Sequence, residues 1–120
     1  MLGDIKLLTM ATAMARHAAE RHRVLSENIA NADTNGYKAK DLEPFAEAYG
    51  RAIDASETGE DIDWRVVYSS RPGAMSPNGN TVSLEDQMMR TVEAQQSHEA
   101  ATAIYKKAME ILRLTLGKNA

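Results

Sequence analysis

The sequence predicts a mainly α protein with long N- and C-terminal amphipathic helices that form a coiled-coil-like assembly domain, and a short irregular middle segment with one or two short strands. Residues 4–31 and 82–116 contain no Pro or Gly and place apolar residues at helical spacing. Residues 37–80 instead hold all three Pro and four of the seven Gly, which permits only short elements. We therefore assign 1–36 plus 81–120 to a helical domain and treat 37–80 as an irregular acidic middle segment.

The N-terminal helix is predicted from apolar residues that recur every three, four or seven positions along one face. At 1.5 Å per residue it would be roughly 40 Å long, more than a chain of this size covers by itself. The residues of this face are Leu7, Ala11, Met14, Ala18, Leu25 and Ile29.

The C-terminal helix is predicted to begin after Ser83, a good N-cap residue, and to end near Gly117 and Lys118. An unbroken four-three alternation forms a first stripe that is apolar at its ends and polar in its middle. This stripe comprises Leu84, Met88, Thr91, Gln95, His98, Thr102, Tyr105, Met109, Leu112 and Leu116. A second stripe widens the apolar face with Ala101, Ile104, Ala108 and Ile111.

The middle segment is predicted to contain a short helix over Pro44–Ala55, a strand over Trp64–Tyr68 and a turn over Ser76–Asn80. In that strand Trp64, Val66 and Tyr68 would share one face. Acidic residues concentrate here and predict a solvated surface that resists self-association. They are Glu43, Glu47, Asp54, Glu57, Glu60, Asp61 and Asp63.

Composition narrows the class of protein. A chain of 120 residues with net charge −3 fits about one domain and gives no sign of a nucleic-acid partner. Without Cys it has neither disulfides nor thiolate metal sites, and no run of about 18 apolar residues could span a membrane. Charges interrupt the first 30 residues, so we expect no secretory signal there and either a cytosolic protein or export without a cleaved signal.

No motif predicts catalysis, and we expect no enzyme activity, catalytic residue, metal ligand or cofactor. His98-Glu begins like a zinc-binding His-Glu-x-x-His motif, but Thr102 stands where the second His should be. His17 and His22 are five residues apart, roughly 140° around a helix, so they are interpreted as surface or interface side chains. The basic cluster to which they belong is interpreted as a solvated or intersubunit ion-pairing face. Its members are Arg16, His17, Arg21, His22 and Arg23.

Two packing schemes remain open for the long helices. In one, their apolar faces pack on each other as a helical hairpin. In the other, the small Ala residues and the polar middle of the first stripe allow close helix approach in an assembly of several copies. For that assembly the predicted packing residues are the six of the N-terminal face together with Leu84, Met88, Ile104, Tyr105, Met109, Leu112 and Leu116.

The stretch Asn28–Lys38 is predicted to stop the first helix abruptly. Asn31 would end the helix, and Gly36 would supply a positive φ in the turn that follows. Tyr37 would then lead the chain out with its ring against the helix end. By physical reasoning alone this is an ordinary helix stop.

Residues 22–45 resemble the N-terminal signature of the bacterial flagellar rod and hook axial proteins, Asn-(Ile/Leu)-Ala-Asn-x-x-Thr-x-Gly-Tyr. The matching residues are Asn28, Ala30, Asn31, Thr34, Gly36 and Tyr37. Gly79–Met89 is similar to the segment Gly-Asn-x-Val-x-Leu-x-x-x-Met of proximal-rod B-type subunits. The one departure in the turn is Asn35, where the family usually has Pro, and the C-type rod subunit remains an alternative.

The resemblance implies a structural subunit of the flagellar basal-body rod, the periplasmic drive shaft that transmits torque and encloses the export channel. It implies export through the flagellar type III apparatus without a cleaved signal. The partners it implies are other rod subunits, the rod-base adaptor protein, the export gate and the membrane ring. A small helical-hairpin binding module, such as a cytosolic regulator or adaptor, is the alternative from another class.

Overall fold

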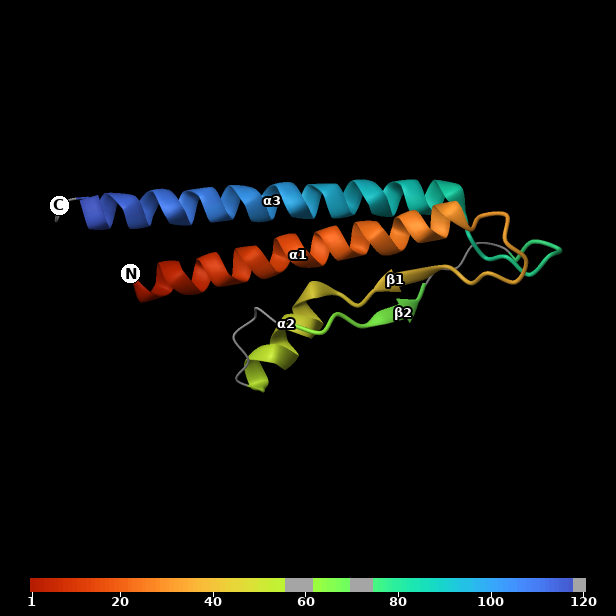
Figure 1. Cartoon of the computed structure of the whole chain (residues 1–120), viewed down its shortest axis with the longest axis horizontal. Coiled ribbons are helices and arrows are strands. Elements are labelled where there is room, and N and C mark those ends of the chain that lie inside the picture. Colours follow the sequence, from red (N-terminus) through yellow and green to blue (C-terminus); the bar gives the residue numbers. More distant parts are fainter. Residues whose placement is uncertain (56–61, 70–74, 118–120) are drawn as a thin grey trace.

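The computed structural model describes residues 1–55, 62–69 and 75–117. Its two long helices, α1 (Leu2–Ala30) and α3 (Leu84–Gly117), run antiparallel, side by side (Figure 1). Between them in sequence come β1 (Lys40–Leu42), α2 (Phe45–Asp54) and β2 (Val66–Tyr68). These short elements lie along the side of α1 away from α3, so the molecule is a plate of 67 × 28 × 17 Å. The predicted fold class is confirmed.

The element boundaries follow the local sequence closely. Ser83 caps α3 as predicted, since its Oγ accepts from the Asp86 amide at 3.3 Å. The short helix begins one residue after Pro44, which suits the N-terminal position of a residue without an N–H. A search for a helix long and apolar enough to cross a bilayer, limited to the described residues, found none.

The predicted strand Trp64–Tyr68 is too long at its start, where Trp64 lies outside the strand. Only Val66–Tyr68 is a strand, and it pairs antiparallel with β1 in the register Lys40↔Tyr68 and Leu42↔Val66. Among the described residues the ribbon consists of these two strands, so β2 has no second neighbour there, and all three of its residues are exposed. We did not predict its partner β1 as an element.

The described core is small and made mostly of alanine. Of its twelve buried apolar residues, nine are Ala, joined by Val24, Leu25 and Leu42. Alanines let the α1 and α3 backbones approach closely but remove little apolar area from water, and area sets the hydrophobic stabilisation. The helix pair therefore depends on other contacts to fix its register.

The buried face of α3 includes two residues of the second stripe, Ala101 and Ala108. Ala94, Ala101 and Ala108, seven residues apart, are buried. The ends of the first stripe point outward, with Leu84 52% and Leu116 55% exposed. Within one chain, most of the residues predicted for subunit packing on α3 are thus left uncovered.

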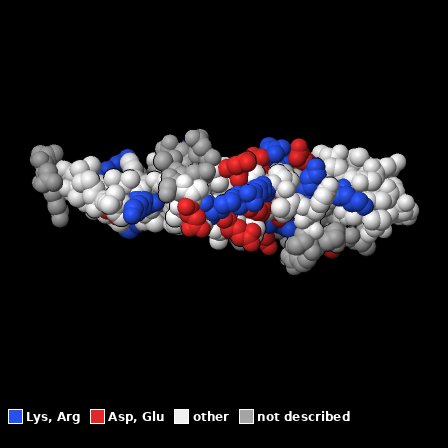
Figure 2. All heavy atoms as spheres, turned by 90° about the horizontal axis from the view of Figure 1, so that it is seen from below, with Lys and Arg blue, Asp and Glu red and all other residues white. Residues whose placement is uncertain are grey.

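Glu43 corrects the prediction that the acidic middle segment is a solvated surface. Its side chain is buried, 5% exposed, because the chain between β1 and α2 lies against α1 and an arginine pairs with the carboxylate. Glu47, Asp54 and Asp63 are exposed, as predicted. The remaining three acidic residues, Glu57, Glu60 and Asp61, lie outside the described residues. Figure 2 shows acidic and basic side chains intermixed over the middle of one long face.

Candidate functional site

The turn after α1 is built as the sequence predicts. Asn31 is the C-terminal cap, and its amide Nδ2 donates to the Glu27 carbonyl at 2.8 Å. Thr34 Oγ1 donates to Asn31 Oδ1 at 3.0 Å. Gly36 has φ 71°, a backbone conformation that costs glycine far less than residues with a Cβ. The helix therefore ends in a turn whose geometry is fixed by its own side chains.

The two sequence segments that resemble rod proteins meet at this turn. The Gly36 amide donates to the Asn78 carbonyl at 2.8 Å. Gly79 has φ 82° and lies close to Gly36, so that a Cβ added to Gly79 would be 3.4 Å from the Gly36 Cα. Asn80, 1% exposed, donates through Nδ2 to the carbonyls of Asn31 (2.8 Å) and Thr34 (2.7 Å). The Asn80 side chain, from the C-terminal end of the middle segment, thus caps the end of α1.

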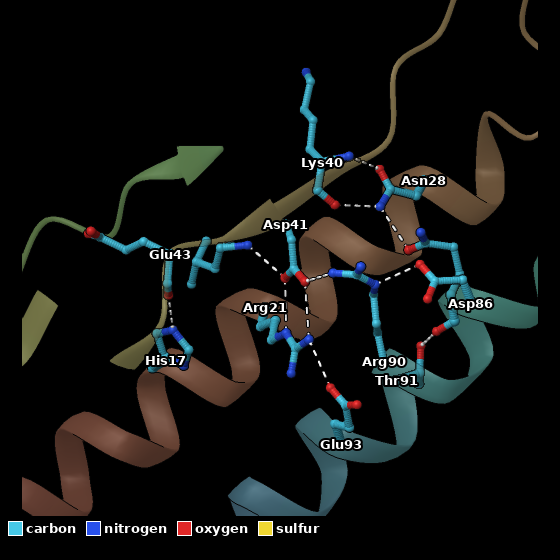
Figure 3. Close-up of polar contacts among 12 residues, drawn as sticks. His17, Arg21, Asn28, Lys40, Asp41, Glu43, Asp86, Arg90, Thr91 and Glu93 are labelled. Carbon is cyan, nitrogen blue, oxygen red and sulfur yellow. Dashed lines mark hydrogen bonds and ion pairs between the residues drawn. The ribbon is translucent and has the colours of Figure 1, made fainter. Parts of the chain in front are cut away.

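Asn28 is the buried centre of the same region (Figure 3). Its Nδ2 donates to the Lys40 carbonyl at 2.6 Å and to Gln87 Oε1 at 2.8 Å. Its Oδ1 accepts from the Lys40 amide at 3.0 Å and from the Tyr37 hydroxyl at 3.1 Å. All four hydrogen-bonding positions of the amide are used, which joins α1, β1 and α3. An aspartate or a leucine could not make this set of bonds.

Asp41 of β1 bridges both long helices (Figure 3). Arg21 of α1 donates to its two oxygens at 2.9 and 3.1 Å, and Arg90 of α3 donates to Oδ2 at 2.6 Å. Arg90 also pairs with Asp86 at 2.7 Å, and Arg21 with Glu93 at 3.2 Å. These five side chains, here called the Asp41 cluster, hold the β ribbon, α1 and α3 in one arrangement.

The charges of the Asp41 cluster stabilise one another. Burial alone would raise the pKa of the Asp41 carboxyl, but hydrogen bonds from Arg21 and Arg90 outweigh it and the pKa lies below its usual value. Burial alone would lower the pKa of both guanidinium groups, yet their carboxylate partners raise it. The buried charges therefore stay ionised as pairs.

A second group of contacts holds the start of α2 against α1. His17 Nε2 lies 2.7 Å from the Glu43 carbonyl oxygen, and its ring packs edge-on against Trp64, with centroids 5.2 Å apart. The Glu43 carboxylate accepts from Arg51 at 2.6 Å and from the Arg65 amide at 3.1 Å. The Arg51 hydrogen bond lowers the pKa of Glu43 against the opposing effect of burial.

The predicted roles of two residues in the basic cluster are therefore wrong. His17 is buried, and Arg21 is bound within the chain, because the middle segment folds back over this part of α1. His22 and Arg23 are exposed, and Arg23 pairs with Glu20 and Glu27 on its own helix. The exposed basic surface of α1 is therefore smaller than the sequence predicted.

The structure brings together some of the predicted site residues and leaves others apart. Of the signature residues, Asn28, Asn31, Thr34, Gly36 and Tyr37 take part in the turn contacts above, while Ala30 is exposed. The predicted packing residues divide by exposure. Ala11, Ala18 and Leu25 are buried; Leu7, Met14, Ile104, Met109 and Leu112 are half-buried; and Ile29, Leu84, Met88, Tyr105 and Leu116 are exposed.

Sequence reasoning missed the partners of these residues. Asp41, Gln87 and Arg90 come from segments more than ten residues away from the helix they contact, and no local pattern announces their pairing. Asn80 had a usable signal, since it stands directly after a Gly in a turn and in the second matching segment. Within the described ranges, no three His, Cys, Asp or Glu side chains are grouped to hold a metal ion.

Comparison with known proteins finds sequence similarity to flagellar rod proteins. The family model described as "Flagella basal body rod protein" matches residues 7–38, which cover most of α1 and the turn that ends it. The curated "Flagellar basal body rod protein FlgB" of Agrobacterium fabrum is 26% identical over 125 residues, with 93% of each chain covered. The chain is thus similar to flagellar basal body rod proteins along most of α1 and its turn, and to FlgB over nearly all of its length.

Proposed function

We propose that the chain is a structural subunit of the proximal part of the flagellar rod, polymerising in the periplasm to form the shaft that transmits motor torque. The observation that carries this proposal is the similarity to FlgB over nearly the full chain. The shape supports it, because two long helices leave apolar side chains such as Leu84 and Leu116 uncovered. Neighbouring copies would cover them.

The proposed mechanism is mechanical. The described helices stretch along a molecule 67 Å long, so each subunit can contact several neighbours over a large lateral surface. Torque would then be carried by distributed packing and not by one site. No catalytic role, cofactor or metal is part of this proposal.

We further propose that 1–36 and 81–120 form the assembly domain around the export channel, with 37–80 docked on its outside. The docking contacts of Asp41 and His17 support this division of labour within one compact unit. Export through the flagellar type III apparatus without a cleaved signal is part of the proposal. So are its partners: other rod subunits, the rod-base adaptor protein, the export gate and the membrane ring.

Deletion of the coding sequence in the source bacterium tests the proposal. We expect loss of swimming, recovery by the wild-type chain, and the chain itself in purified basal bodies. A deletion strain that swims normally would reject the flagellar role. It would leave the helical-hairpin binding module, an alternative consistent with α1 packing on α3 inside one chain.

Two substitutions test the placement of the packing surface. Leu112→Asp and Met109→Asp would each bury a carboxylate in a helix seam, so we expect no rod assembly and no swimming. Lys106→Asp is the matched control, because Lys106 is an exposed position on the same helix. Normal swimming by both stripe variants would show that this part of the stripe is not an interface.

A further inference from the structure

The chain contains two Asn-Gly pairs, Asn35-Gly36 and Asn78-Gly79, and the fold places them in contact. One lies in the turn that ends α1 and the other in the turn ahead of α3, and these two turns meet at one end of the molecule (Figure 1). The two asparagines are 43 residues apart in the sequence, and both are exposed. Water therefore reaches both pairs.

Asn-Gly is the dipeptide in which asparagine cyclises most readily. The backbone nitrogen of the glycine attacks the asparagine Cγ, the side-chain nitrogen leaves as ammonia together with the proton of the glycine amide, and a succinimide ring forms. Water then adds to either carbonyl of the ring and opens it to aspartate or isoaspartate. Glycine favours the attack because it has no Cβ to hinder the approach. The reaction needs no oxidant, metal or cofactor.

The structure engages both attacking nitrogens in hydrogen bonds. The Gly36 amide donates to the Asn78 carbonyl at 2.8 Å, and the Gly79 amide donates to the Ser76 carbonyl at 2.8 Å. An amide must lose its proton to attack, and an amide that donates to a carbonyl gives up its proton less readily. Each bond therefore slows cyclisation, although both sites are open to water.

The side chains of the two asparagines are also held. Asn78 Nδ2 donates to Asn35 Oδ1 at 3.1 Å, and Asn78 Oδ1 accepts from the Asn80 amide at 3.1 Å. Cyclisation requires the side chain to turn until its Cγ meets the nitrogen of the following glycine, and this movement breaks these bonds. The restraint on Asn35 is supplied by Asn78, from the other turn.

The contact between the turns has further supports. Asn80 Nδ2 donates to the Asn31 and Thr34 carbonyls at 2.8 and 2.7 Å, and Lys38 Nζ donates to the Gly79 carbonyl at 3.1 Å. None of these bonds uses the side chain of a labile asparagine. A conservative substitution of one labile asparagine should therefore leave the turns together.

We propose that Asn35-Gly36 and Asn78-Gly79 are two sites of succinimide formation and deamidation that the contact between the turns keeps unreactive, so that they react while the chain is unfolded. This inference goes beyond the proposed function and does not depend on it. Isoaspartate at either site adds one carbon to the backbone at the point where a Cβ on Gly79 would be only 3.4 Å from the Gly36 Cα. A turn lengthened there cannot dock as before, so a chain modified before it folds keeps a defective contact.

Peptide mass spectrometry of the purified full chain tests the protection. The chain is incubated at mildly alkaline pH in buffer and in urea, and is then digested in weakly acidic buffer, which stops the reaction. We expect both pairs to deamidate roughly 30-fold more slowly in buffer, because cyclisation there must first break at least two hydrogen bonds. Asn31, which Ala follows, is the internal control and should react slowly in both conditions. Equal rates in buffer and in urea for the two pairs would overturn the proposal.

Two conservative variants test whether one turn protects the other. Asn78→Asp loses the donor to Asn35 Oδ1 but keeps an acceptor for the Asn80 amide. Asn35 should then deamidate about fivefold faster in buffer, the effect of one hydrogen bond, and at the wild-type rate in urea. Asn35→Asp is the matched control, because it keeps the acceptor for Asn78 Nδ2 and should leave the rate at Asn78 unchanged.

Circular dichroism checks that both variants keep their helices, and the wild-type comparison of buffer with urea needs no variant at all. An unchanged rate at Asn35 in folded Asn78→Asp would show that the second turn does not protect the first, and the proposal would be wrong. It would also be wrong if the same acceleration appeared in urea, because the effect would then not come from the folded contact.

Discussion

Asp41→Ala should destabilise the isolated chain more than any substitution of an exposed acidic residue. The carboxylate accepts from Arg21 (2.9 and 3.1 Å), Arg90 (2.6 Å) and the Leu42 amide (2.7 Å). Removing one partner of a buried ion pair typically costs about 3–5 kcal/mol. Here each guanidinium keeps a second carboxylate, so we expect the lower end, about 3 kcal/mol.

Urea unfolding followed by circular dichroism measures this change, since urea leaves ion pairs unscreened. A loss of about 3 kcal/mol is a large share of the 5–15 kcal/mol typical of a domain, and would lower the melting temperature by roughly 12 °C. Asp54→Asn, at an exposed position, is the control and should change the free energy of unfolding by less than about 0.5 kcal/mol. An equally small change for Asp41→Ala would refute the role of the cluster.

A triple variant tests the physical cause. Replacing Arg21 and Arg90 by Met and Asp41 by Leu removes the buried charges together, and such replacements are often neutral or stabilising. We expect it to regain most of the stability lost in Asp41→Ala. Persistent loss would mean that the shape of the cluster matters more than its charges.

Three further predictions concern the other contacts. Because the folded-state pKa values of Asp41 and Glu43 lie below their usual values, both contribute stability that is present above about pH 4 and lost as pH falls through the folded pKa. Urea titrations at several pH values should therefore show a smaller acid slope in an Asp41→Asn, Glu43→Gln double variant, and an unchanged slope would contradict this. His17→Ala should cost about 1–2 kcal/mol and shift the emission of Trp64, the only tryptophan, to the red, whereas the exposed His22→Ala should do neither. Gly36→Val should cost about 2 kcal/mol through backbone strain alone, since a Cβ there meets no atom within 4 Å, and Gly36→Asn should cost less in the same unfolding assay.

The fold could be predicted from the sequence where its cause is local. Helical periodicity predicted α1 and α3, and the residues around Gly36 predicted the turn that ends α1, including its positive φ. Each of these follows from the conformational preferences of neighbouring residues. The two sequence matches also lay in segments that turned out to be in contact.

The candidate site could be predicted only in part, because its bonds join distant segments. The sequence predicted a role for Asn28 but not for its partner Gln87. It assigned Arg21 to a solvated or intersubunit ion-pairing face, whereas Arg21 pairs with Asp41 of the same chain. Packing reasoning also favoured the larger residues of the first stripe on α3. The shorter Ala94, Ala101 and Ala108 are buried instead, because small side chains let the two backbones come close.

The alanine-rich core has a consequence for the response of the chain to temperature. Exposure of apolar surface raises the heat capacity on unfolding, while exposure of polar surface lowers it. The interior consists mainly of alanines, and its buried polar side chains include Asn28, Asn80, Gln87 and Arg90. Unfolding therefore exposes little apolar surface and much polar surface. The free energy of unfolding should therefore vary gently with temperature, so that a single subunit keeps nearly the same modest stability in cold and in warm water.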